Sequence, residues 1–423
     1  MTSLRAAGAP STLPHSASTR RALFGAALAT VLGSLVACET APRAEGETGS
    51  AAASSAAGAE AGALSAARTG PPTAEELDAR MIIGPTAART LGYRVAWESG
   101  PFTAAPETLK LGSPLGDSVF IIDTRNNLTR LRTADGIRIW STPVGGPADV
   151  VYDILRVDDP SGDRVMVLTD GALFVFDGTN GVMIDRQALR RPANTKAVLV
   201  GPFVIYGGRT GQIVWHQARV GHHWRVNEIS GSIRAAPIVA GSDIAVASTT
   251  GDVAVMDVGT ARTIWTKRLL AGIVAPMATA RGFLFIAGQD QYLWAIDVGD
   301  GRTIWKHFND APLTTGPIVL GDRLYQRIPS RGITCFDAFV KDRLDGVILW
   351  SNPDVPGQVI GLRGNALLAW DEPSRTLTML DRSGGVMHRI ALPKVARLRL
   401  ESPENGDLYA LDDAGRITRL VPR

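Results

Sequence analysis

The sequence repeats itself at short range. Leu293–His307 reads LWAIDVGDGRTIWKH, and Val253–Lys267, forty residues earlier, reads VAVMDVGTARTIWTK. With Trp305 as the reference, equivalent positions recur at intervals of 39 to 45 residues, and there are eight of them. Six of these positions hold tryptophan: Trp97, Trp140, Trp224, Trp265, Trp305 and Trp350. The other two hold Asp185 and Arg389. A repeat of about 42 residues accommodates four short antiparallel strands, which is the size of one propeller blade.

The unit from residue 272 to residue 308 predicts those four strands. We expect them at 273–278, 283–287, 292–297 and 302–306, with glycine-containing turns between them. The second is continuously apolar (FLFIA), which predicts burial on both faces of the sheet. Blades stacked face to face in a ring would bury it in this way.

The two ends of the chain predict how the ring closes. Asp407–Leu420 resembles Ser118–Leu131, the second and third strands of an earlier blade, so the C-terminus supplies only three strands. The segment around Trp97 is a fourth strand without a blade of its own. We therefore predict an all-β fold: an eight-bladed β-propeller of four-stranded antiparallel blades, in which the N-terminal strand joins the C-terminal blade and removes the free edges.

The N-terminal residues predict export and a lipid anchor. Residues 22–37 form an apolar run that is short for a bilayer span but fits a secretory leader. The run ends in Leu35-Val36-Ala37-Cys38, which resembles a bacterial lipobox and predicts lipidation of Cys38. Arg20 and Arg21 resemble a twin-arginine export signal, and the general secretory route stays open as the alternative.

Composition divides the remainder of the chain. Residues 1–37 are assigned to the signal peptide. Residues 38–73 are rich in Ala, Gly, Ser and Glu without an aromatic residue, which predicts a disordered tether. Residues 74–91 are expected to form a short helical lead-in with a capping box from Thr73 and Glu76, ended by Gly84-Pro85. Residues 92–423 are expected to form the propeller.

Charge and cysteine content exclude two classes of protein. The chain has 44 Lys and Arg against 41 Asp and Glu, and three of the arginines (Arg5, Arg20 and Arg21) precede residue 38. A mature chain with no net charge does not favour nucleic-acid binding. Two cysteines, Cys38 and Cys335, exclude a disulfide framework, and Cys335 occupies a position that predicts a buried structural thiol.

Several polar residues are candidates for chemistry. His216 lies near His222 and His223, which are adjacent on a predicted strand and point to opposite faces, an arrangement unfavourable for one metal ion. Five aspartates recur with the repeat, which favours local turn formation over general acid–base catalysis: Asp257, Asp297, Asp337, Asp381 and Asp412. The regular spacing of the tryptophans favours packing between blades over a ligand-stacking box.

The repeat also resembles a known family. The pattern Ala295-x-Asp297-x-x-Asp300-Gly301-x-x-x-Trp305 is similar to the repeat of quinoprotein-like propellers, with Asp300 where that family has threonine. Two kinds of protein share this repeat. One comprises dehydrogenases that bind pyrroloquinoline quinone and calcium, typically under a disulfide of adjacent cysteines. The other comprises BamB-like lipoproteins of outer-membrane assembly, which hold no cofactor.

The resemblance implies a function. This chain has no Cys-Cys pair and few long insertions, and it has a lipobox, which together favour the BamB-like kind. We therefore expect a non-enzymatic scaffold without cofactor or metal, anchored by lipid at the periplasmic face of the envelope. Its partners would be envelope proteins, including a barrel subunit of outer-membrane assembly. A quinone-binding or small-molecule-binding propeller enzyme, and an envelope scaffold with an unrelated partner, remain the alternatives.

Overall fold

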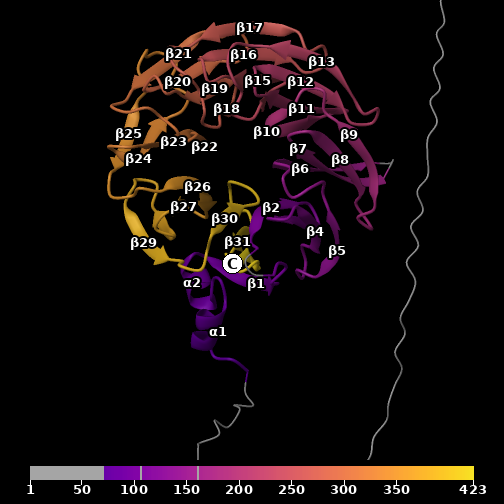
Figure 1. The fold of residues 1–423 in the computed structure, drawn as a ribbon. Helices are drawn as coiled ribbons and strands as arrows, with labels where there is room; N and C mark the ends of the chain where they lie inside the picture. The colour runs from indigo at the N-terminus through magenta and orange to yellow at the C-terminus, as the bar shows by residue number, and fades with distance from the viewer. Residues whose placement is uncertain (1–70, 105–106, 160–161) are drawn as a thin grey trace, which may run out of the picture. The chain divides into compact units, whose positions relative to one another are not determined.

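The structure is a computed structural model that describes residues 71–104, 107–159 and 162–423. Its strands form eight four-stranded antiparallel sheets, arranged around a common axis as the blades of one ring (Figure 1). The predicted signal peptide and most of the predicted tether, including Arg20, Arg21 and Cys38, lie outside the described residues. Within the described ranges, no helix is long and apolar enough to cross a bilayer.

Blades 1 to 4 follow one another along the chain. Blade 1 comprises β2 (Leu109–Leu115), β3 (Ser118–Asp123), β4 (Asn127–Arg132) and β5 (Arg138–Pro143). Blade 2 comprises β6 (Val151–Asp159), β7 (Gly162–Thr169), β8 (Ala172–Asp177) and β9 (Met183–Ala188). Blade 3 comprises β10 (Ala193–Val200), β11 (Phe203–Gly208), β12 (Gln212–Gln217) and β13 (His222–Glu228). Blade 4 comprises β14 (Ile238–Ala240), β15 (Asp243–Ala247), β16 (Asp252–Asp257) and β17 (Thr263–Arg268).

Blades 5 to 7 repeat this order and blade 8 departs from it. Blade 5 comprises β18 (Ala278–Ala280), β19 (Phe283–Ala287), β20 (Tyr292–Asp297) and β21 (Thr303–Phe308). Blade 6 comprises β22 (Ile318–Leu320), β23 (Arg323–Ile328), β24 (Gly332–Asp337) and β25 (Ile348–Asn352). Blade 7 comprises β26 (Gln358–Arg363), β27 (Ala366–Asp371), β28 (Thr376–Leu380) and β29 (Val386–Ala391). Blade 8 comprises β30 (Arg397–Leu400), β31 (Leu408–Leu411), β32 (Ile417–Pro422) and the N-terminal β1 (Tyr93–Ser99).

The predicted ring closure is confirmed. β1 pairs antiparallel with β32, from Tyr93 opposite Pro422 to Ser99 opposite Ile417. Gly92 and Arg423 also meet, because the Arg423 N–H donates to the Gly92 carbonyl at 3.1 Å. The two ends of the chain thus form the outer pair of strands of one blade, and the backbone groups of β32 gain a partner on each side.

The blade interiors follow from the apolar second and third strands. Every residue of β19 is buried, as its continuous apolar run predicts, and every residue of β3 is buried as well. The first strand of blade 5 is shorter than expected, because 273–277 does not join the sheet. Pro276 has no N–H to donate, and the Ile273 N–H donates to the Ser248 carbonyl of the preceding blade. This segment links two blades instead of extending one.

Two short helices precede the ring. Helix α1 (Ala74–Arg80) begins with the expected capping box, in which Thr73 and Glu76 each accept a hydrogen bond from the other's main-chain N–H. Gly84-Pro85 does not end this helix, which stops at Arg80. Pro85 is instead the first residue of α2 (Pro85–Thr90), where its missing N–H costs no hydrogen bond.

The lead-in packs on the ring between blades 7 and 8. Ile82, Ile83 and Leu91 are buried in one cluster with Leu368 and Met379 of blade 7 and Leu408 and Leu420 of blade 8. The Ile82 N–H donates to a carboxylate oxygen of Glu98 in β1 at 2.7 Å. Figure 1 shows α2 beside the blade that holds the C-terminus. The lead-in therefore reinforces the closure of the ring.

We predict that removal of residues 71–99 opens the ring. The deletion leaves β32 with an unpaired edge and uncovers the apolar residues that Ile83 and Leu91 bury, so the denaturation midpoint falls and soluble protein aggregates. Urea unfolding and size-exclusion chromatography measure both effects. A permuted chain that begins at Gly100 and carries residues 92–99 after Arg423 should regain much of the lost stability. An unchanged midpoint in the truncated protein would contradict the closure argument.

Candidate functional site

The repeated tryptophans lie at the contacts between neighbouring blades, which are called seams below. A seam without its tryptophan marks a place where the ring departs from the repeat. Four outer-strand tryptophans, Trp97, Trp140, Trp265 and Trp350, each donate the indole Nε1–H to a main-chain carbonyl of the next blade. The acceptors are Thr133, Gly178, Val298 and Arg382, at 2.8, 2.7, 2.7 and 2.9 Å. Thr133, Gly178 and Val298 are each the first residue after the third strand, and Arg382 is the second. The tryptophans therefore connect blades, as the spacing predicts.

The indole rings also explain the glycine of the repeat. Gly301 has a φ of +74° and lies against the ring of Trp265 from the blade before it, where an added Cβ would stand 2.7 Å from ring carbons. Gly181 lies in the same way against Trp140, and Gly384 against Trp350. Any side chain at these positions would collide with the indole. The glycine and the tryptophan that depend on each other are thus in neighbouring repeats, not in the same one.

Trp305 keeps the packing without the hydrogen bond. Its side chain is fully buried and its ring lies over Gly346 of blade 6. Its Nε1 has no partner among the described residues. The turn that follows β24 is longer than its counterparts, and the Asp337 N–H donates to the Val347 carbonyl across it. In other blades this part of the turn supplies the carbonyl that accepts the indole hydrogen bond, and the insertion in blade 6 has changed it.

Trp224 does not occupy the repeat position assigned to it. In the β12–β13 register, Arg225 lies opposite Trp215, and Trp224 falls on the bulge one residue earlier. Its ring stacks on Phe203 of the same blade with centroids 4.9 Å apart. A fully buried tryptophan from the third strand, Trp215, takes over the seam and donates to the Val258 carbonyl at 3.1 Å.

The same seam shows why the glycine can be lost. Blade 4 has Ala261, with a φ of +56°, at the turn position where the other turns have glycine. No outer-strand indole presses on it, because Arg225 stands where the tryptophan would be. The Asn227 amide instead donates to the Ala261 carbonyl at 2.5 Å.

Arg389 does not occupy the repeat position assigned to it in blade 7. The turn before β29 is one residue shorter than its counterparts, so His388 lies opposite Met379 in that position.

Asp185 marks the seam between blades 2 and 3, and here no indole is present. Asp185 does occupy the repeat position, opposite Val175. Two residues further on, the Gln187 amide donates to the Ala218 carbonyl at 2.7 Å, which is the acceptor equivalent to Gly178 and Val298 elsewhere. An amide therefore replaces the tryptophan hydrogen bond but supplies much less apolar volume.

A cavity of about 460 Å³ remains at this seam. Its walls include Met166, Val175 and Leu199, and its rim includes Ile184, Asp185 and Gln187. Met166 and Val175 are buried, whereas Ile184 is 49% exposed. The lining also includes two arginines, Arg164 and Arg219. The cavity therefore combines apolar walls with charged side chains and is open to solvent beside Ile184.

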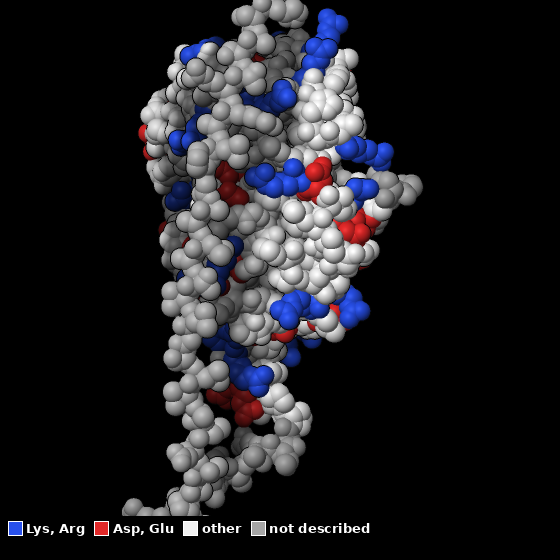
Figure 2. Space-filling model, turned by 45° about the vertical axis from the view of Figure 1, so that its right-hand side comes forward, with Lys and Arg blue, Asp and Glu red and all other residues white. Residues whose placement is uncertain are grey.

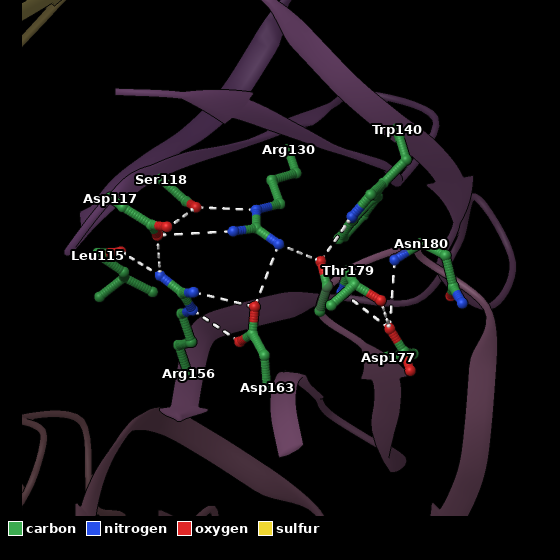
Figure 3. Close-up of polar contacts among 11 residues, drawn as sticks. Leu115, Asp117, Ser118, Arg130, Trp140, Arg156, Asp163, Asp177, Thr179 and Asn180 are labelled. Carbon is green, nitrogen blue, oxygen red and sulfur yellow. Dashed lines mark hydrogen bonds and ion pairs between the residues drawn. The ribbon is translucent and has the colours of Figure 1, made fainter. Parts of the chain in front are cut away.

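A charged network braces the seam between blades 1 and 2 (Figure 3). Arg156 forms two hydrogen bonds to Asp163, at 2.7 and 2.9 Å, and a further one to Asp117. Arg130 reaches Asp163 at 3.1 Å and shares the Gly178 carbonyl with Trp140. The hydrogen bond from Arg156 lowers the pKa of Asp117. Both carboxylates are paired with arginine, which suits a structural brace and leaves neither of them as a general base.

The histidines form no metal site. His216 is buried and hydrogen-bonded to Gln187 Oε1 at 2.7 Å, whereas His222 is exposed on β13. Burial first, and the nearby His222 and His223 second, lower the pKa of His216 to about 4. Over residues 71–104, 107–159 and 162–423, no three His, Cys, Asp or Glu side chains are grouped to hold a metal ion.

The recurring aspartates form turns. Asp257 accepts hydrogen bonds from the main chain and hydroxyl of Thr260, and Asp381 does the same with Ser383. These side-chain hydrogen bonds lower the pKa of both carboxyls. Asp297, Asp337 and Asp412 accept from main-chain N–H groups two residues further on. All five serve the local turn, as their periodicity indicates.

The described residues contain no carboxylate cluster of the kind that would favour calcium binding. Calcium requires several oxygen ligands, and the part of the chain that the structure describes has no cluster of three carboxylates. Cys335 is a free, buried thiol, and burial raises its pKa to about 11. A buried protonated thiol is unreactive, which agrees with the structural role expected for it.

The ring resembles known propellers both in sequence and in shape. Residues 201–307, from blade 3 to blade 5, match the family described as outer membrane protein assembly factor BamB. The crystal structure of BamB from Moraxella catarrhalis superposes with a TM-score of 0.59 at 21% identity, covering 75% of this chain and 97% of that one. The ring is similar to the BamB β-propeller.

Other comparisons set the limits of that similarity. The computationally designed Ika8 protein superposes with a TM-score of 0.60 at 13% identity, covering 77% of this chain and 99% of that one. A BamB-like ring is therefore similar in shape to a designed protein as well as to BamB, so shape alone assigns no partner. Among curated proteins, no sequence matches significantly.

We predict an energetic coupling between each seam tryptophan and its glycine. Trp140→Leu should cost about 3 kcal/mol of unfolding free energy. Gly181→Ala should be strongly destabilising beside Trp140, and the double variant should be at least ~1 kcal/mol more stable than the two separate losses imply. Urea unfolding of the four proteins measures this. Gly201→Ala is the control, because Gly201 has a φ of +54° and no neighbouring atom within 4 Å of an added Cβ. Strict additivity would contradict the coupling.

We also predict a pH dependence from His216. Since the pKa of His216 is about 4 in the folded protein and its ordinary value is 6.5, the unfolded chain binds a proton first as the pH falls. The stability contributed by neutral His216 is present above the unfolded pKa and is lost between about pH 6.5 and 4. His216→Gln should flatten this decline in urea unfolding at pH 7.5 and pH 5. His388→Gln, at an exposed position, should leave it unchanged, and an equal decline in all three proteins would exclude the assignment.

Proposed function

We propose that this protein is a non-enzymatic scaffold of the cell envelope with a BamB-like role in outer-membrane protein assembly. The observation that carries the proposal is the match of blades 3 to 5 to the BamB family within a complete eight-bladed ring. The seams support it further, since the candidate acids and bases form turns or arginine pairs that hold the blades together.

The N-terminal residues complete the proposal. Residues 1–37 act as the leader, with Arg20 and Arg21 in its export signal, and the lipid is attached to Cys38. Residues 38–73 form the tether between the lipid and the ring. A flexible chain of about 36 residues has a root-mean-square reach of roughly 30–35 Å. The ring would thus lie close to the periplasmic face of the outer membrane, within reach of an assembly barrel subunit.

The surface agrees with binding to folded proteins. Figure 2 shows small groups of basic and acidic side chains separated by uncharged surface on the side that it turns forward. A surface without a single-sign field does not select nucleic acid. It suits protein interfaces, in which charged groups surround an uncharged centre.

One experiment tests both the anchor and the partner. The tagged protein is solubilised from envelopes with detergent, and co-purified proteins are identified by mass spectrometry. We expect an assembly barrel subunit with the wild-type protein, and release of Cys38→Ser from the membrane fraction. Cys335→Ser is the matched control and should remain with the membrane. Retention of Cys38→Ser would contradict the anchor. Another envelope protein in place of the barrel subunit would support a scaffold with an unrelated partner.

A further inference from the structure

At the seam between blades 2 and 3, an apolar volume stays open. Three seams lack the outer-strand tryptophan. Between blades 3 and 4 the volume is filled by Trp215, and between blades 7 and 8 by Ile82, Ile83 and Leu91 of the lead-in. Between blades 2 and 3, Gln187 replaces the hydrogen bond only, and the cavity of about 460 Å³ remains.

We propose that this cavity binds an aromatic side chain, tryptophan or phenylalanine, presented by a partner protein. Asp185 stands opposite Val175 just as Trp265 stands opposite Val255, so the cavity begins where an indole lies in regular blades. Its volume lies within the range of about 300–1,000 Å³ typical of ligand pockets. An aromatic anchor in a pocket with apolar walls is a common centre of a protein interface.

The polar groups at the seam favour an apolar occupant. The Gln187 amide donates to Ala218 and to Asp185, and its oxygen is paired with His216. The seam hydrogen bond is therefore complete before anything binds. The occupant needs to supply apolar surface against Met166, Val175 and Leu199 beside the guanidinium groups of Arg164 and Arg219. An aromatic ring offers both the apolar surface and a face on which a guanidinium group can stack.

The occupant has to come from another polypeptide. The sequence before residue 71 contains one aromatic residue, Phe24, and it lies in the predicted leader. The tether at 38–73 has none, so the chain's own N-terminal segment cannot fill the cavity once the leader is removed. Ile184, which lines the cavity and is 49% exposed, offers apolar surface for residues that flank the anchor.

The test selects peptides that bind the full-length protein from a library of random 12-residue sequences. We expect the selected peptides to share a tryptophan or phenylalanine. Asp185→Trp, which supplies the indole from within, should bind them at least about tenfold more weakly and should raise the unfolding midpoint. Ile184→Lys, a substitution on the exposed rim, should also weaken binding, and it keeps the test valid if Asp185→Trp folds poorly.

Ile264→Trp is the matched control, because it adds an indole at an exposed position of β17 that does not line the cavity, and it should bind the peptides as the wild type does. Peptides without a shared aromatic residue, or equal binding to wild type, Asp185→Trp and Ile184→Lys, would overturn the proposal. A free aromatic metabolite that co-purifies in the cavity would also overturn it. The inference rests on the proposed scaffold function but not on the role in outer-membrane assembly. If the pull-down yields no barrel subunit, the assembly role is contradicted, and the peptide experiment alone decides whether the cavity binds an aromatic side chain.

Discussion

The ring depends on one interaction repeated between neighbours, an indole that lies over a turn glycine and donates to the carbonyl at the start of the same turn. A blade alone cannot make it, because the tryptophan belongs to one repeat and the glycine and carbonyl to the next. Trp97 extends the arrangement across the closure, since it lies on the N-terminal strand of blade 8 and bonds to Thr133 of blade 1. The contact between Trp97 and blade 1 therefore packs two blades together through the same strand that closes the ring.

The departures from this contact show what the seam requires. At two of the three seams without the outer indole, the hydrogen bond to the turn carbonyl is kept by Trp215 or by Gln187. A buried carbonyl left without a partner would cost about 1–3 kcal/mol, which favours keeping this bond. The two parts of the contact can nevertheless separate: Trp305 packs at its seam without the hydrogen bond, and Gln187 makes the hydrogen bond without filling the volume. The turn glycine is replaced by Ala261 at a seam from which the outer indole is absent.

Much of the fold could be predicted because the repeat spacing reports strand number and turn type directly. Register could not be predicted from spacing alone: Trp224 lies one residue from the position opposite Trp215, and a bulge sends it to the other face. The brace formed by Arg130, Arg156 and Asp163 was also missed, because Arg130 and Asp163 come from different repeats. Its signal was an arginine shared by two blades. Arg419 lies opposite Trp97 as Arg130 lies opposite Trp140, and each arginine donates to the carbonyl that the tryptophan also uses. Gln187 carried no such signal, since its partner Ala218 acts through the main chain.

The residues that hold the blades together differ from those that we propose to bind a partner. The match to the BamB family spans 201–307, which includes the seams filled by Trp215 and Trp265. A filled seam has no volume for another protein, so the family signature reports how the blades are held together. The cavity walls at Met166, Val175 and Ile184 come from blade 2, outside that match, whereas the facing residues Ala218 and Arg219 of blade 3 lie within it. A partner that recognises this chain would therefore read residues that the repeat does not constrain, and two propellers with the same signature can differ in what they bind.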